Sequence, residues 1–249
     1  ENAGRDGTLV VHNIGKQKDK NDGFNADTDE YNDLRKDDVN DPVRSYTDDP
    51  VPDDALDRVL ALALRAPTGS GAQSWGLLVI RDPRRRREVA ELVIDGATQY
   101  FSIMRPTGEG VSDDEHLRWA REYAEGVIGT YRHVPVWVLG LVIPRKTYPP
   151  QMAEWGRQDD VISLAFAMEN LMLAARAEGL GTVPTTAFWR FEEPRLRAAL
   201  NLPDDVEPCV LTPLGVPTAF PTGKPPALAK TFKSWRSLDW CGEDARAAV

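Results

Sequence analysis

The stretch from Ala66 to Trp75 contains residue types that could hold a flat ligand. Its sequence, Ala-Pro-Thr-Gly-Ser-Gly-Ala-Gln-Ser-Trp, places small residues in a turn and then a Gln and a Trp at a fixed distance. A backbone without bulky side chains can approach a ligand closely and offer its N–H groups. Gly/Ser-rich turns between a helix and a strand are also common for structural reasons, so the pattern gains weight only from its neighbours.

A second group of polar side chains lies in the sequence Pro184-Thr185-Thr186-Ala187. Each threonine hydroxyl can donate or accept a hydrogen bond. Taken alone, two threonines after a proline are more typical of a strand or a turn than of a binding site.

The elements that must position these two segments follow from hydrophobic periodicity, which predicts an α+β domain. The run 134–142 is apolar and β-branched, which is typical of a strand buried on both faces. The other predicted strands are 77–80 and 208–214, and the predicted helices are 53–65, 84 to about 93, about 113–131, about 160–178 and about 193–200.

The predicted helix 160–178 has an unusually broad apolar surface. Asp159 or Asp160 is its predicted N-cap and Gly179 its C-terminal stop. A helix that is apolar nearly all round must be buried on more than one side. Either a second subunit covers part of it, or it is an ordinary core helix of a monomer.

These motifs, taken in order, resemble the nitroreductase family of FMN-dependent oxidoreductases, and the pattern is most similar to the iodotyrosine-deiodinase branch. The resemblance extends from about Val43 to about Pro225, and several motifs agree in order and spacing. They are Val43-Arg44-Ser45-Tyr46, the stretch 66–75, Gly76 to Pro83, Asn170 to Ala175, and Gly179-Leu180-Gly181-Thr182.

The resemblance implies a three-layer α/β/α fold with a central mixed, mostly antiparallel sheet in an intertwined homodimer. Residues 43–225 would form the FMN-binding domain. Residues 226–249 would form a C-terminal arm that docks on the partner subunit, in keeping with the aromatic residues there. Residues 1–42 are expected to be an acidic, mobile arm, because a segment so poor in aliphatic residues buries too little surface to offset ordering entropy.

The resemblance also implies which residues bind FMN. Thr186 matches the position at which a hydroxyl meets N5 of the flavin ring in the deiodinase-like branch, which favours one-electron steps, and it is the predicted catalytic residue. Contacts to the ring edge and ribityl chain fall on the glycine-rich turn. The predicted cofactor-binding residues are Arg44, Ser45, Pro67, Thr68, Gly69, Gly71, Gln73, Pro184, Thr185, Thr186, Ala187 and Lys224.

The predicted phosphate anchor departs from the family pattern. An Arg-Arg-Ser-like triplet is usual where this chain has Asn40-Asp41-Pro42, and Gly223 stands where a basic residue is frequent. Asp would repel a phosphate that Arg binds bidentately. Either FMN affinity is reduced, or another basic group substitutes, or the N-terminal segment is not the native one.

The expected activity is reduction of an electron-poor aromatic or quinone-like small molecule with NAD(P)H by a ping-pong mechanism. Two alternatives stay open: a specialised flavoenzyme of the same family (a reductive dehalogenase, a flavin-fragmenting enzyme or a biosynthetic dehydrogenase), or a scaffold with weakened flavin binding that acts as a binding protein. Aromatic side chains that could stack on the substrate are Tyr100, Trp119, Tyr123 and Trp189.

Composition excludes several other classes of partner. A formal net charge of -9 over 249 residues argues against nucleic acid or an anionic membrane as the main ligand. No apolar stretch approaches the length needed to span a bilayer, and no signal-peptide pattern is present, so a cytoplasmic location is expected.

Metal binding is not predicted from the cysteines and histidines. Two cysteines, Cys209 and Cys241, make no disulfide framework, and three scattered histidines lack ligand spacing. Acidic residues between 19 and 29 suggest a calcium loop, but their spacing misses the EF-hand pattern, and a solvated acidic tail is the favoured interpretation.

Overall fold

A computed structural model describes residues 9–12, 43–105, 110–143 and 149–220. Five strands form one sheet in the order β1-β2-β3-β5-β4. They are β1 (Leu9–His12), β2 (Trp75–Ile80), β3 (Val136–Val142), β4 (Gly181–Thr182) and β5 (Glu207–Gly215). Every strand pairing in these residues is antiparallel, which confirms the predicted mostly antiparallel sheet.

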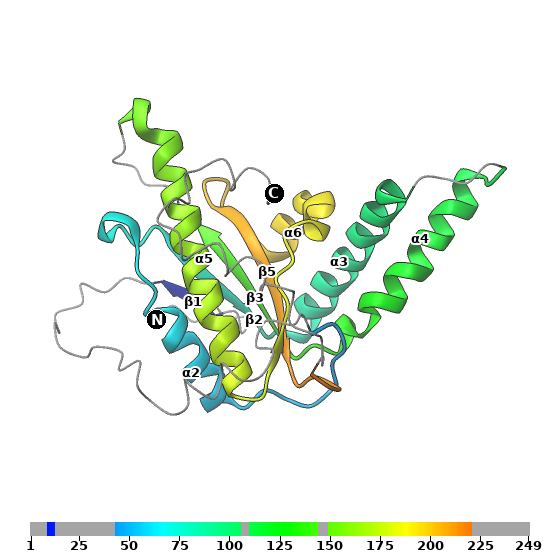
Figure 1. Cartoon of the computed structure of the whole chain (residues 1–249), viewed down its shortest axis with the longest axis horizontal. Helices are drawn as coiled ribbons and strands as arrows, with labels where there is room; N and C mark the ends of the chain where they lie inside the picture. The colour runs from blue at the N-terminus through cyan, green and yellow to red at the C-terminus, as the bar shows by residue number, and fades with distance from the viewer. Residues whose placement is uncertain (1–8, 13–42, 106–109, 144–148, 221–249) are drawn as a thin grey trace, which may run out of the picture.

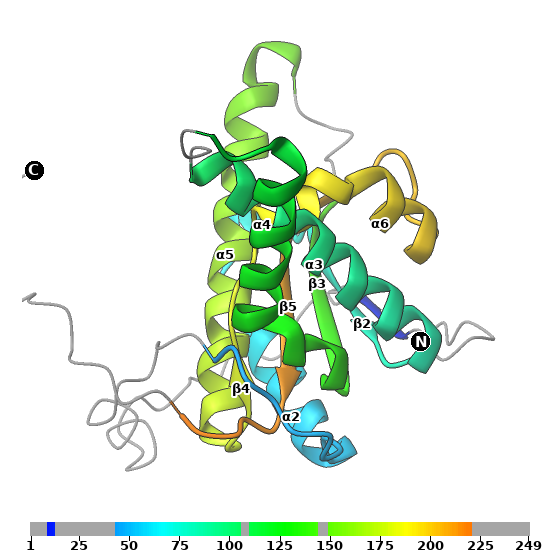
Figure 2. The same ribbon diagram turned by 90° about the vertical axis from the view of Figure 1, so that its right-hand side faces the viewer.

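Helices cover both faces of this sheet, so the predicted three-layer α+β fold is confirmed (Figure 1). One face packs against α2 (Asp53–Ala63) and α5 (Ala153–Ala177). The other packs against α3 (Pro83–Met104), α4 (Asp113–Ile128) and α6 (Glu193–Leu200). In the turned view of Figure 2, α3 and α4 face the viewer and α5 lies behind them.

The central strands β2 and β3 are buried at every position, as the apolar run 134–142 predicts. Successive side chains of a strand point to opposite faces, so one strand feeds both cores. Leu78 and Ile80 join the core under α3, whereas Leu77 and Val79 join the core under α5. Burial on both faces explains why the hydrophobic run does not alternate.

Two predicted helix boundaries are wrong. The helix expected to end near Val93 continues to Met104, and Gly96 lies inside it, packed against the backbone of Phe188. The long helix begins at Ala153 rather than beside Asp160, which is a buried interior residue of α5. Its predicted stop is confirmed, since Gly179 follows the helix with a φ of 73°.

Helix α5 buries only one side within the chain. Leu164, Met168 and Leu171 pack in the core, whereas Trp155, Ile162 and Phe166 are 63%, 51% and 49% exposed. The prediction that this helix is buried on more than one side is therefore not met by a single copy of the chain. No helix among the described residues is long and apolar enough to cross a membrane.

Candidate functional site

The glycine-rich turn between α2 and β2 holds an unusual backbone conformation. A short 3-10 turn spans Gly69–Gly71, and Ser70 and Gln73 have φ values of 54° and 49°. Within the described ranges only one further non-glycine residue, Asn201, has positive φ. This conformation is costly for a residue with a Cβ, and such strain gathers at functional sites.

Two serines anchor this turn to α5. The Ser163 hydroxyl accepts a hydrogen bond from the Gly69 N–H at 3.0 Å, and the Ser74 hydroxyl donates to the carboxylate of Asp160. Asp160 and Ser163 are 2% and 3% exposed. Sequence reasoning missed both anchors, because only the fold brings α5 against the turn.

The surface of the turn is open to a ligand. A Cβ added at Gly71 would meet nothing within 4 Å, and Gly71 has a φ of 63°. The N–H groups of Gly71 and Ala72 close the turn on the Thr68 and Gly69 carbonyls, so they are not available to a ligand. The predicted contact between this turn and a ligand therefore depends on how closely the turn's backbone can approach the ligand and on its other backbone N–H groups.

Thr185 is held against β5 on both of its backbone groups. Its N–H donates to the Leu211 carbonyl at 2.8 Å, and its carbonyl accepts from the Leu211 N–H at 3.1 Å. The Trp189 indole N–H donates to the same carbonyl at 3.0 Å. Thr185 is buried, whereas the next residue, Thr186, is exposed. The exposed Thr186 therefore follows directly after a residue whose backbone is held by three hydrogen bonds.

Arg44 and Ser45 lie at the same edge of the sheet. The Val43 N–H donates to the Thr182 carbonyl at 3.1 Å, and the Thr130 hydroxyl donates to the Arg44 carbonyl at 3.0 Å. Both Arg44 and Ser45 are exposed, and no ion pair to the Arg44 guanidinium is found in the described part of the chain. This edge thus offers a cation and hydroxyls to an anionic ligand.

Two buried phenols lie behind Arg44 and stay neutral. Burial raises the pKa of Tyr46 and of Tyr131 above their ordinary value, against the opposing charge of Arg44. The Tyr46 hydroxyl donates to the Val43 carbonyl at 2.8 Å. These tyrosines therefore position the Arg44 backbone without cancelling the arginine's charge.

The structure does not bring the glycine-rich turn and Thr186 together within one subunit. The turn leads into β2, whereas Thr185 pairs with Leu211 on the outer side of β5, so β3 and β5 lie between them. In Figure 1 the two segments lie on opposite sides of α5. Lys224, which is also predicted to bind the cofactor, lies outside the described residues. The triplet at 40–42, which departs from the family's phosphate-binding pattern, lies outside them too.

Three of the four predicted substrate residues form one aromatic cluster on α3 and α4. Trp119 stacks on Tyr123 with ring centroids 5.5 Å apart. Tyr123 meets Phe101 at 4.9 Å, and Tyr100 meets Phe188 at 5.4 Å. Tyr123 is 46% exposed, so the cluster has an open face on which a planar ligand can stack.

Trp189, the fourth predicted substrate residue, lies in the core with 1% of its surface exposed. Its indole is already bonded to Thr185. This burial argues against contact with a substrate and indicates that Trp189 supports the backbone beside Thr186.

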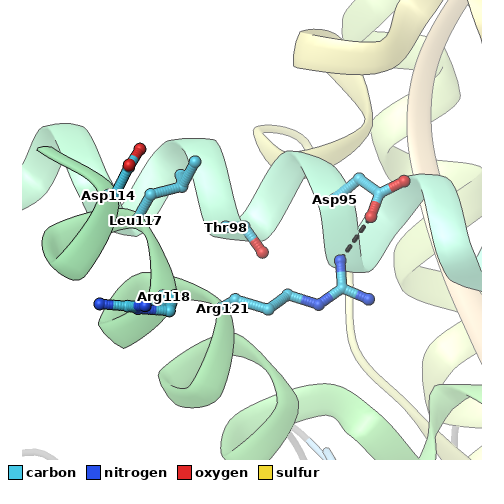
Figure 3. A pocket seen from close by; sticks show the side chains of 6 residues that line it. All are labelled: Asp95, Thr98, Asp114, Leu117, Arg118 and Arg121. Atoms are coloured by element: carbon cyan, nitrogen blue, oxygen red, sulfur yellow. Dashed lines mark hydrogen bonds and ion pairs between the residues drawn. The ribbon is translucent and has the colours of Figure 1, made fainter.

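A cavity of about 570 Å³ lies elsewhere on the α3–α4 pair (Figure 3). Arg121 and Asp95 point toward one another across it and form an ion pair at 2.5 Å. No predicted cofactor or substrate residue lines this cavity, whose walls are Asp95, Thr98, Asp114, Leu117, Arg118 and Arg121.

Metal chemistry finds no support in the described residues, where no group of His, Cys, Asp and Glu could hold an ion. Cys209 is buried, as predicted, and burial raises the pKa of its thiol to about 11. It is therefore a poor nucleophile at neutral pH.

Known proteins resemble the chain over the region that contains these groups. A family model described as "Nitroreductase family" matches residues 42–216. An NADH dehydrogenase from Thermus thermophilus is 29% identical over 70% of the chain and 82% of its own length. Rat iodotyrosine deiodinase 1 is 28% identical over 71% of the chain, and the match spans 59% of the rat protein.

Solved structures support the same fold. A hypothetical oxidoreductase from Bacillus subtilis, YcnD, superposes with a TM-score of 0.63 at 19% identity, covering 89% of this chain and 78% of its own. Iodotyrosine deiodinase bound to FMN and 3-iodo-L-tyrosine superposes with a TM-score of 0.56 at 20% identity, covering 78% and 94%.

Proposed function

The chain belongs to the nitroreductase family, and on that premise we propose that it is an FMN-dependent oxidoreductase that reduces an electron-poor aromatic or quinone-like molecule with NAD(P)H. The observation that carries the proposal is that the exposed Thr186, next to the hydrogen-bonded Thr185, lies at the same sheet edge as the exposed Arg44. When bound, FMN supplies the redox chemistry, and the protein supplies binding and orientation.

The residues at this edge fit such a group. The Arg44 guanidinium can bind a phosphate through two parallel hydrogen bonds, and Ser45 adds a hydroxyl. The Thr186 hydroxyl can donate to a ring nitrogen or accept from its N–H. The aromatic cluster of Tyr100, Trp119 and Tyr123 provides the surface on which a planar substrate would stack.

We propose that the glycine-rich turn reaches the flavin from a second copy of the chain. Within one subunit, two strands separate this turn from Thr186. The exposed apolar side of α5, next to the serines that anchor the turn, is the surface that a partner would cover. A homodimer would thereby complete the site and bury Ile162 and Phe166.

The dimer can be tested by placing a charge on this surface. Ile162→Asp would put a carboxylate in a buried apolar contact, which is unfavourable by several kcal/mol, on the order of 2 to 5. We expect the wild type to have twice the 27.7 kDa mass of the chain in light scattering and the variant to be monomeric with weakened FMN binding. The matched control is Ile103→Asp at the 68% exposed end of α3, which should stay dimeric. A monomeric wild type would contradict the proposal.

An absorbance spectrum tests the function most directly. We expect bands at about 370 and 450 nm from bound flavin in the purified protein, or in protein that is mixed with FMN and then separated from free FMN by gel filtration. Oxidation of NADH or NADPH should then depend on a nitroaromatic or a quinone, with parallel lines in double-reciprocal plots for a ping-pong cycle. A protein that is colourless after free FMN has been removed would instead support the interpretation as a flavin-free binding protein.

Reductive dehalogenation is a second candidate, which the Thr186 hydroxyl and the similarity to iodotyrosine deiodinase 1 favour. Iodide release from 3-iodo-L-tyrosine under reducing conditions distinguishes the two. Iodide release faster than nitroaromatic reduction would make dehalogenation the principal activity.

A further inference from the structure

Trp189 is a large buried side chain with one polar contact. It is 1% exposed, and its indole Nε1 lies 3.0 Å from the Thr185 carbonyl oxygen. The same oxygen also accepts from the Leu211 N–H at 3.1 Å. Two donors from different elements therefore converge on the peptide bond that joins Thr185 to Thr186.

Two other buried tryptophans of the core lack such a bond. The indole nitrogens of Trp75 and Trp137 are buried and have no partner in the described residues. Trp137 is 0% exposed and contacts Tyr131 only edge to face, with ring centroids 5.6 Å apart. Trp75 and Trp137 thus fill space in the core without an indole hydrogen bond to a described residue, whereas Trp189 both fills space and makes a directional hydrogen bond.

The turn that contains Trp189 is fixed on its other side by α3. A Cβ added at Gly96 would lie 1.9 Å from the Phe188 carbonyl oxygen, so the two backbones touch. Beside this contact, the Gln99 amide donates to the Glu192 carboxylate at 2.6 Å. The turn that contains the indole is therefore packed against α3. The indole hydrogen bond links the Thr185 carbonyl to that packed turn.

We propose that Trp189 is the positioning residue for the Thr186 hydroxyl, an inference that rests on the proposed flavin chemistry. The Thr185 carbonyl and the Thr186 N–H belong to one planar peptide unit. Holding the carbonyl oxygen with two donors holds the orientation of that plane, and with it the position of the Thr186 Cα from which the side chain extends. Trp189 thus acts through Thr185 and touches neither cofactor nor substrate.

The first test measures the bond itself and needs no flavin. Trp189→Phe keeps an aromatic ring and removes the N–H. Loss of a single hydrogen bond of ordinary strength should make local opening about threefold to tenfold more frequent, so amide exchange at Leu211 and Thr185 should accelerate by that factor. The matched control is Trp137→Phe, which removes an indole N–H without a hydrogen-bond partner among the described residues and should leave these two amides unchanged.

The second test measures the consequence for the bound cofactor. Thr186→Val removes the hydroxyl. The quantity measured is the difference between the two one-electron reduction potentials of protein-bound FMN, and this variant shows how much that difference changes when the hydroxyl is absent. We expect Trp189→Phe to shift this difference in the same direction by a measurable fraction, and Trp137→Phe to match the wild type. An anaerobic titration with reference dyes reports the potentials independently of turnover.

The outcomes separate this inference from the proposed function. Wild-type potentials in Trp189→Phe, beside a clear shift in Thr186→Val, would overturn the positioning role and leave the flavin function intact. A wild type that binds no FMN would overturn the proposed function. Amide hydrogen exchange at Leu211 in Trp189→Phe would still show whether the Trp189–Thr185 hydrogen bond holds this segment. If Trp189→Phe does not fold, benzothienylalanine at position 189, in which sulfur replaces the N–H at nearly equal ring volume, takes its place.

Discussion

Replacing Gly96 with alanine is expected to destabilise the protein by about 3 kcal/mol, the upper end of the usual cost of overpacking. The new methyl carbon would lie 1.9 Å from the Phe188 carbonyl oxygen and 2.7 Å from its carbon. Both partners are backbone atoms of packed elements, so no flexible side chain can move aside. For a protein of this size the midpoint of thermal unfolding should fall by about 6 to 12 °C.

Gly126→Ala is the matched control for this substitution. Gly126 lies in α4, is exposed, and an added Cβ would meet nothing within 4 Å. Alanine is the better helix former by up to about 1 kcal/mol, so this variant should be as stable as the wild type or more stable. Circular dichroism melts of the three proteins decide the matter. Equal melting of Gly96→Ala and Gly126→Ala would show that α3 and the Phe188 turn are not in contact.

Replacing Arg44 with alanine should raise the dissociation constant for FMN by about 10- to 100-fold, the value of one charge-assisted hydrogen-bonded contact. Riboflavin has the same ring and no phosphate, so its weaker binding should hardly change. The ratio of the two affinities therefore isolates the phosphate contact. Fluorescence quenching of each flavin on binding provides both constants.

Two variants control the Arg44 experiment. Arg84→Ala removes another exposed arginine, at the start of α3, and should leave both affinities unchanged. Arg44→Lys keeps the charge without the planar fork and should recover only part of the FMN affinity. If Arg44→Ala weakened FMN and riboflavin equally, the guanidinium would act on the ring or the fold and not on phosphate.

Local sequence determined much of the secondary structure, whereas the candidate site residues were predicted from the ordered motifs that resemble the nitroreductase family. The apolar β-branched run 134–142 predicts β3 because burial on both faces leaves no room for polar alternation. The bounds of α6, 193–200, match because a proline near its first turn and an αL residue at its end, Asn201, mark both ends locally. The small residues of the turn before β2 predicted a backbone that a ligand can approach closely, whereas the positive φ values of Ser70 and Gln73 came only from the structure.

Tertiary structure alone decided how the predicted residues are supported and which of them can meet. Asp160 is expected from its sequence neighbours to cap a helix, but it lies inside α5, where its carboxylate accepts a hydrogen bond from Ser74, 86 positions away. Trp189 is an aromatic residue beside the site in sequence, and only the turn after Ala187 directs its indole inward to Thr185. Hydrophobic periodicity reports that a side chain is buried. It carries no information on the partner, because contacts between distant segments depend on how the layers pack.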